Sequence, residues 1–211
     1  MNDTILIFDF DGTIADTHHH IIKISNQLAE EFGYSVIKPD EIEELKDKSS
    51  REVIRYLKVP IFKIPAILAR AKKALYDGMA EIDPIEGLKE ILQKLKDLDS
   101  RMGILSSNAP ENINKFLANH DLEVFEFVDS TLKVWTKNIS LKKLLERHGF
   151  LPKQILYIGD ETRDIEAAKA LGIKVAAVTW GYNSATALKK HDPDFLIHTP
   201  QELFELCTNH H

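Results

Sequence analysis

Ile5-Leu6-Ile7-Phe8-Asp9-Phe10-Asp11-Gly12-Thr13 is the stretch that decides the fold of this chain. Its four leading apolar residues predict a short strand of a parallel sheet, buried on both faces. Two carboxylates follow directly, and Gly12 allows a sharp backbone turn after them. The Thr13 hydroxyl stands near the start of a helix, where free N–H groups favour an anion. Because open α/β sheets bind ligands at the carboxyl ends of their strands, the stretch predicts a functional site there.

The composition is that of a globular protein, with 211 residues of which 44% are hydrophobic and 28% charged. The 27 basic and 33 acidic residues give a net charge of −6. No basic stripe is present, so we expect no nucleic-acid partner. An acidic protein with an anionic substrate needs a local positive site or a metal ion.

The first apolar run is too short for a signal peptide and lies between Asp3 and Asp9. No apolar run approaches the roughly 20 residues of a membrane span. Cys207 is the only cysteine, which excludes an internal disulfide. We therefore expect a cytoplasmic protein with no membrane partner, and the sequence leaves open whether it is a monomer or a dimer.

Strands and helices alternate from residue 84 onward. Short apolar strands are predicted at residues 102–105, 124–129, 154–158, 174–179 and 195–197. Between them, apolar residues recur at three- and four-residue steps, as in amphipathic helices. Together with the first strand, this alternation predicts an α/β fold, a doubly wound parallel sheet with helices on both faces.

Residues 16–83 have a different pattern, in which no segment is typical of a strand. Asp16 or Thr17 can cap a first helix that runs to Phe32 and ends at Gly33. Shorter helical pieces are predicted at 39–46, 50–57 and 64–79. We therefore expect an α/β core made of residues 1–15 and 84–211, with a helical insertion at 16–83.

Polar side chains follow four of the predicted strands. These side chains are Asp9 and Asp11, Ser107 and Asn108, Lys137, and Asp160 and Asp164. Parallel strands bring their carboxyl ends to one edge of a sheet, so we expect these groups to meet there.

In order and spacing, these groups resemble the four motifs of the haloacid dehalogenase superfamily of phosphohydrolases. The stretch Gly159-Asp160-Glu161-Thr162-Arg163-Asp164 matches the Gly-Asp-x-x-x-Asp pattern of the fourth motif. The insertion at 16–83 stands where that family carries its C1-type cap. The chain is similar to phosphoglycolate-phosphatase-like members in particular. It departs from them after Lys137, where Asn138 stands in place of the frequent proline.

The resemblance implies a Rossmann-like core and a phosphatase that uses Mg²⁺ to hydrolyse a small-molecule phosphate ester. Asp9 would be the nucleophile that forms an aspartyl-phosphate, and Asp11 the general acid and then the general base. The family pattern assigns the metal to Asp9, the backbone carbonyl of Asp11 and Asp160, with Asp164 steadying the site. Hard oxygen ligands of this kind suit Mg²⁺.

The resemblance also implies a phosphate site. Ser107 and Thr13 would bond phosphoryl oxygens, with Asn108 beside them, and Lys137 would supply positive charge. Ser107 fits the family pattern better than Ser106, because it directly precedes Asn108.

Three further features have weaker interpretations. Arg51 stands in the first turn of a predicted helix, where it either reaches a substrate carboxylate or is simply solvated. His18-His19-His20 point in different directions on a helix, which argues against a three-histidine metal site, although one of them can face the active-site mouth. Trp180 and Tyr182 follow the fifth predicted strand and are more typical of packing than of substrate stacking.

Other functions compete with the phosphatase. A phosphomutase uses the same cap and motifs, whereas a haloalkanoate dehalogenase lacks the acid/base that Asp11 provides. A phospho-acceptor receiver domain also uses Asp, Mg²⁺ and Lys, but it has no helical insertion. A binding module without activity is a further alternative. Release of phosphate from an aryl phosphate, with and without Mg²⁺, distinguishes an enzyme from a binding module.

Overall fold

The computed structural model describes residues 4–130 and 137–209. Its single sheet has six strands in the order β3-β2-β1-β4-β5-β6, and every neighbouring pair is parallel. The strands are β1 (Ile5–Phe8), β2 (Arg101–Ser106), β3 (Phe127–Ser130), β4 (Ile155–Gly159), β5 (Lys174–Val178) and β6 (Phe195–Ile197). β1 lies at the centre, where Ile5 is in register with Arg101 of β2 and Ile155 of β4. The predicted parallel sheet is confirmed.

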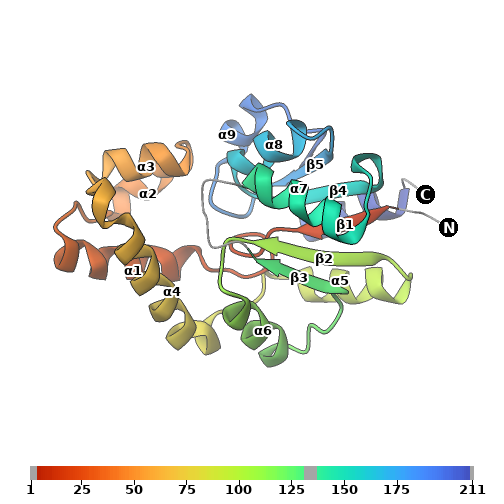
Figure 1. Cartoon of the computed structure of the whole chain (residues 1–211), viewed down its shortest axis with the longest axis horizontal. Helices are drawn as coiled ribbons and strands as arrows, with labels where there is room; N and C mark the ends of the chain where they lie inside the picture. Colours follow the sequence, from red (N-terminus) through yellow and green to blue (C-terminus); the bar gives the residue numbers. More distant parts are fainter. Residues whose placement is uncertain (1–3, 131–136, 210–211) are drawn as a thin grey trace.

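Helices cover both faces of this sheet. Alternate residues of a strand point to opposite sides, so they enter two separate cores. Leu6 and Phe8 belong to the core on the side of α5 (Leu88–Asp97), α6 (Pro110–Asn119) and α10 (Pro200–Asn209). Ile5 and Ile7 belong to the core on the side of α7 (Lys137–His148), α8 (Thr162–Lys169) and α9 (Ala185–Lys190). Figure 1 shows α5 and α6 on one side of the strands and α7 and α8 on the other.

Helical segments make up the chain between β1 and α5, which has no strand of the sheet. They are α1 (His18–Phe32), α2 (Ile42–Lys46), α3 (Ser50–Tyr56) and α4 (Ile64–Gly78), with short 3₁₀ turns at Pro39–Glu41, Ile61–Lys63 and Met79–Glu81. We call residues 16–83 the cap. α1 packs on α4, and the cap helices gather beyond one end of the sheet in Figure 1.

The two chain crossings between core and cap lie side by side. The backbone N–H of Asp16 donates to the carbonyl of Asp83 at 2.9 Å, and that of Ile85 donates to Ile14 at 2.9 Å. The first crossing directly follows the turn after β1, and the second crossing is hydrogen-bonded to it. The cap is therefore attached next to the carboxyl end of the central strand.

Some element boundaries differ from the sequence prediction. β3 begins at Phe127 rather than at 124, because Val124 is buried in the core without pairing to β2. α9 was not predicted, although Ser184 caps it by accepting from the N–H of Ala187 at 3.1 Å. Thr17 does stand at the N-terminus of α1, but its side chain makes no capping bond. Gly33 ends α1 in the left-handed conformation, at φ 75°, as predicted.

Candidate active site

A buried lysine joins two of the predicted acids at the carboxyl edge of the sheet. Lys137, the first residue of α7, places its Nζ 2.5 Å from Asp9 Oδ2 and 2.5 Å from Asp164 Oδ1. Burial opposes the charge of Lys137, but the carboxylates of Asp164 and Asp9 raise its pKa well above the ordinary value. The ammonium group is therefore charged and bridges the residue after β1 to the first turn of α8.

Asp9, Asp160 and Asp164 form a buried acidic cluster. One carboxylate oxygen from each lies within 4.8 Å of the others. Burial, and then the negative charges of Glu161, Asp164 and Asp9, raise the pKa of Asp160 well above its ordinary value. Burial raises the pKa of Asp164 to about 6, although Lys137 opposes the shift. Such crowding of hard oxygen ligands fits a small divalent cation, which would relieve the mutual repulsion.

Asp160 is held from both sides by the loops around it. Thr13 Oγ1 donates to Asp160 Oδ1 at 2.7 Å, and the N–H of Tyr182 donates to Asp160 Oδ2 at 2.7 Å. Gly12 makes this approach possible, because a Cβ there would lie 2.4 Å from Asp160 Oδ2 and its φ is +77°. The structure thus places the Thr13 hydroxyl on Asp160, whereas the sequence predicts a phosphoryl oxygen as its partner.

Asp11 lies outside the acidic cluster and faces the space under the cap. Asn108 Nδ2 donates to both Asp11 carboxylate oxygens, at 3.1 Å each. Burial, followed by the charge of Asp9, raises the pKa of Asp11 to about 7. Asn108 is itself fixed, because its Oδ1 accepts from Asn112 Nδ2 at 2.7 Å. The predicted phosphate-site amide thus contacts the predicted acid/base.

Two residues with no role in the sequence prediction also belong to this site. Arg163 forms an ion pair with Glu161, whose Oε2 accepts from Ser50 Oγ of the cap at 2.6 Å. Asn183 follows β5, and its Oδ1 accepts from the N–H of Thr162 at 2.9 Å. Arg163 lies inside the fourth motif and could have been noticed there. No sequence signal marks Asn183.

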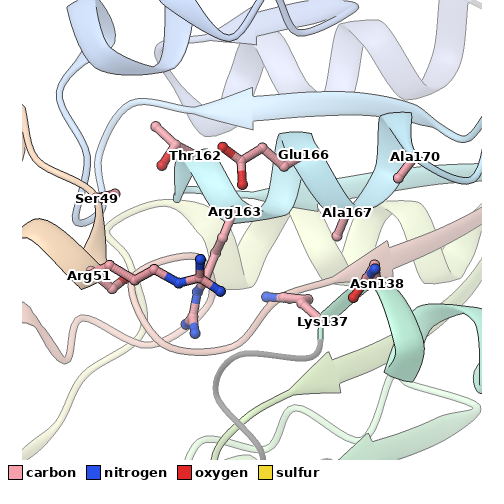
Figure 2. A pocket seen from close by; sticks show the side chains of 10 residues that line it. Ser49, Arg51, Lys137, Asn138, Thr162, Arg163, Glu166, Ala167 and Ala170 are labelled. Atoms are coloured by element: carbon pink, nitrogen blue, oxygen red, sulfur yellow. The ribbon is translucent and has the colours of Figure 1, made fainter. Parts of the chain in front are cut away.

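A cavity of about 450 Å³ opens between α3, α7 and α8. Figure 2 shows Arg51, Arg163 and Lys137 pointing into it from the cap, from α8 and from α7. Glu166 also lines this cavity, and its carboxylate lies 3.4 Å from His191 Nδ1. Three cationic groups therefore converge at one mouth of the site in a protein whose net charge is −6.

A second cavity, of about 340 Å³, lies between Asp11 and the cap. Ser107 and Tyr182 line its core side, and His18 lines it from α1 with its ring centroid 5.2 Å from that of Tyr182. His19 is exposed and His20 lines a depression elsewhere, so the three histidines do not converge. Tyr182 is thus more than a packing residue: its hydroxyl also bonds the Thr17 hydroxyl, at 2.9 Å.

Trp180 packs against the core, as its sequence pattern indicated. Its Nε1 donates to the carbonyl of Thr13 at 3.2 Å, which fixes the loop after β5 against the turn after β1. Among residues 4–130 and 137–209, no helix has the length and apolar character needed to cross a membrane.

Comparisons with known proteins agree with this geometry. The family model described as haloacid dehalogenase-like hydrolase matches residues 6–178. The chain is 35% identical to a phosphoglycolate phosphatase of Synechococcus elongatus over 204 residues, which covers 96% of each protein. It is 23% identical to the pyrophosphatase PpaX of Bacillus cereus, with 99% of this chain and 98% of that protein covered.

Among solved structures, a predicted phosphatase from Clostridium acetobutylicum superposes with a TM-score of 0.84. It is 20% identical to this chain, and the match covers 98% of both. At this identity the likeness shows a shared fold. The fold match extends over the cap as well as the core.

Proposed function

The chain belongs to the haloacid dehalogenase-like hydrolase family, and on that premise we propose that it is a Mg²⁺-dependent phosphatase of a small phosphomonoester. One observation carries the proposal: Asp9 lies at the end of the central strand, 2.5 Å from a buried lysine, with Asp11 two residues on. A nucleophile, a cation and an acid/base therefore lie within reach of one phosphoryl group.

Asp9 acts as the nucleophile in this proposal. One of its carboxylate oxygens attacks phosphorus, the bond to the ester oxygen breaks, and Asp11 gives its proton to the leaving alcohol. Asp11 then takes a proton from water, which attacks the aspartyl-phosphate and releases inorganic phosphate and free Asp9. A pKa of about 7 suits Asp11 for both transfers near neutral pH. Asn108 orients this carboxyl group through its two hydrogen bonds.

The acidic cluster fits a divalent cation, and Mg²⁺ is the ion that we propose for it. Asp9, Asp160 and the backbone carbonyl of Asp11 would hold the ion, with Asp164 steadying the site. When bound, the ion supplies positive charge that offsets the negative charge of the phosphoryl group. Thr13 contributes by holding Asp160 in place through its hydroxyl.

The substrate phosphate is recognised by positive charge and short polar groups. Lys137 lies beside the nucleophile, and Arg51 and Arg163 extend its positive charge to the mouth of the cavity in Figure 2. Lys137 and Arg163 offset the negative charges of Asp9, Asp164 and Glu161, which lowers the repulsion that an anionic substrate would meet there. Ser107 and the backbone around Thr13 are proposed as phosphoryl contacts, and Arg51 as a contact at the entrance.

A small metabolite is the proposed substrate class, because cap helices line one side of the space beside Asp11 and that space has a volume of only about 340 Å³. Such a space excludes a polymer and much bulk water. 2-Phosphoglycolate is the first compound to test, since it is the substrate named for the Synechococcus elongatus relative.

The test is phosphate release from a panel of phosphate esters, in Mg²⁺ and in excess chelator. We expect Mg²⁺-dependent turnover that Asp9→Asn abolishes. Asp192→Asn is the matched control, since Asp192 is an exposed acid that pairs with Lys169 and lines neither cavity. Rearrangement of an ester without net phosphate release would indicate a phosphomutase. Binding of esters with no chemical change would indicate a binding module.

A further inference from the structure

The cavity above Asp11 has two chemically different sides. Its core side carries the polar groups of Asp11, Ser107 and Tyr182, together with Arg163 and Glu161, which form an ion pair with each other. Its cap side is aliphatic over three helices, with side chains that include Ile21, Ile22, Ile42, Leu45, Val53 and Ile54. A phosphoryl group on Asp9 would leave the organic part of the ester facing this aliphatic surface, which we call the cap wall.

Charged groups around the cap wall already have partners of opposite sign. Lys46 lies 2.9 Å from Glu43, and Lys48 lies 3.0 Å from Glu44. Both of these acids are on α2, and their side chains are mostly exposed. His18 lines the same space, and burial lowers its pKa, which favours the neutral ring. A second anionic group on a substrate would therefore meet aliphatic carbon and paired charges here.

The volume of this cavity also favours an organic group that is larger and less polar than glycolate. An aliphatic cavity of about 150 Å³ is enough to take up benzene, so 340 Å³ accommodates roughly twice that volume. Glycolate is much smaller than this, and its carboxylate would lose its water to meet cations that already have carboxylate partners. A group of about six to ten carbon atoms fits both the volume and the surface.

From the volume, the cap wall and the paired charges, we propose that the preferred substrate is a phosphomonoester whose alcohol is apolar, either a medium-length alkyl or an aryl group. The inference rests on the proposed phosphatase function and adds the chemical class of its substrate. The cationic mouth of Figure 2 then receives the phosphate end, while the cap wall receives the organic end.

The direct test is a series of n-alkyl phosphates from ethyl to octyl, with phenyl phosphate and 2-phosphoglycolate, assayed for kcat/KM in Mg²⁺. Burial of one methylene is worth about 0.8 kcal/mol, so each added carbon should raise kcat/KM about fourfold until the cavity is full. Propyl phosphate should exceed 2-phosphoglycolate by at least about tenfold, because the buried carboxylate is penalised.

The outcomes separate this inference from the proposed function. A flat alkyl series with good turnover of 2-phosphoglycolate would overturn the inference and leave the phosphatase standing. Absence of hydrolysis of every ester would overturn both. A rise with chain length, followed by a fall beyond the volume of the cavity, supports both.

A positive charge introduced into the cap wall supplies a second test. Ile22→Lys places an ammonium group in the cap wall and should shift the preference from propyl phosphate toward 2-phosphoglycolate by at least about tenfold. Ile61→Lys is the matched control: Ile61 belongs to the cap, is 79% exposed and lies outside this cavity. An equal shift in both variants would overturn the inference, since it would reflect overall charge.

A third measurement needs no variant and covers the case in which Ile22→Lys fails to fold. n-Alkyl phosphonates resist hydrolysis, and their inhibition constants on the wild-type protein should fall about fourfold per methylene. Inhibition constants that do not change from methyl to hexyl phosphonate would overturn the inference.

Discussion

Asn183 connects the cap to the acidic cluster, and its removal should loosen the cap by a predictable amount. Its Nδ2 donates to the carbonyls of Lys46 and Lys48 in the cap, at 2.9 Å each. Its Oδ1 accepts from the N–H of Thr162, beside Asp160, at 2.9 Å. The residue is only 5% exposed, so water does not easily replace these bonds.

The magnitude follows from which groups lose their partner. In Asn183→Ala, Lys46 keeps one hydrogen bond, because the N–H of Ser184 also donates to its carbonyl at 3.0 Å. The two bonds that hold the cap, from Asn183 Nδ2 to the Lys46 and Lys48 carbonyls, are both lost, whereas the bond to the Thr162 N–H lies within the core. At about 1 kcal/mol for each of the two cap bonds, the cap should open more easily by about 2 kcal/mol. That corresponds to roughly a 30-fold larger population of the open form.

Trypsin reports this opening, because it cleaves after Lys46 and Lys48, whose carbonyls Asn183 holds. When opening is fast relative to cleavage, the cleavage rate follows the open population. Asn183→Ala should therefore be cut there roughly 30-fold faster than the wild-type protein. Asn114→Ala, which removes an exposed asparagine from α6, should not change the rate.

A second variant separates the two arms of Asn183. Asn183→Asp retains an acceptor for the Thr162 N–H but has no donor for the cap, so its cleavage should be as fast as that of the alanine variant. The reasoning would be refuted if urea unfolding showed a loss of about 2 kcal/mol while cleavage at Lys46 and Lys48 rose less than threefold. Asn183 would then stabilise the core without holding the cap.

Four other perturbations have defined outcomes. Asp9→Asn should abolish steady-state phosphate release, since an amide does not attack phosphorus; normal turnover would exclude it as nucleophile. With Asp11 as the acid, kcat/KM should fall above about pH 7, where the carboxyl loses its proton. Asp11→Asn should lower the rate about 10²–10⁴-fold and remove this decrease above pH 7. The folded-state pKa values of Asp160 and Asp164, the latter about 6, lie above the ordinary 3.8. Without metal their contribution to stability is therefore present below about pH 4 and lost as the pH rises through 6, so added Mg²⁺ should raise the Tm more at pH 8 than at pH 5. Replacing residues 16–83 by a Gly/Ser linker should leave Mg²⁺ binding but remove discrimination among esters, as measured by the ratio of kcat/KM for the best substrate to that for an aryl phosphate.

Local sequence patterns were sufficient for most of the fold. The run Ile5–Phe8 predicted a strand that the structure buries completely, and the alternation after residue 84 predicted the parallel sheet. These features depend on neighbouring residues and on short periodicities, which a sequence displays directly. Where the local sequence pattern was weak, the prediction was less accurate. β3 begins three residues after its predicted start, and the only local sign of the short α9 is its Ser184 cap.

The residues of the candidate site could also be predicted, because residue types and their order are given directly by the sequence. Asp9, Asp160, Asp164 and Lys137 do meet at one edge of the sheet, and Asp11 faces the cavity under the cap. The parallel topology explains why: it brings the carboxyl ends of distant strands together. The catalytic roles of these residues remain predictions that the substitutions above address.

Only the tertiary structure decided which donor meets which acceptor. Thr13 and Asp160 are 147 positions apart, and their hydrogen bond depends on the turn at Gly12 and the placement of β4. Asn183 has no sequence signal, because its function is to span loops from three regions of the chain. The shape and polarity of the cavity under the cap likewise arise from helices that are separated in sequence. Sequence alone determined the fold class and the set of reactive groups, while long-range packing determined their partners and the space left for a substrate.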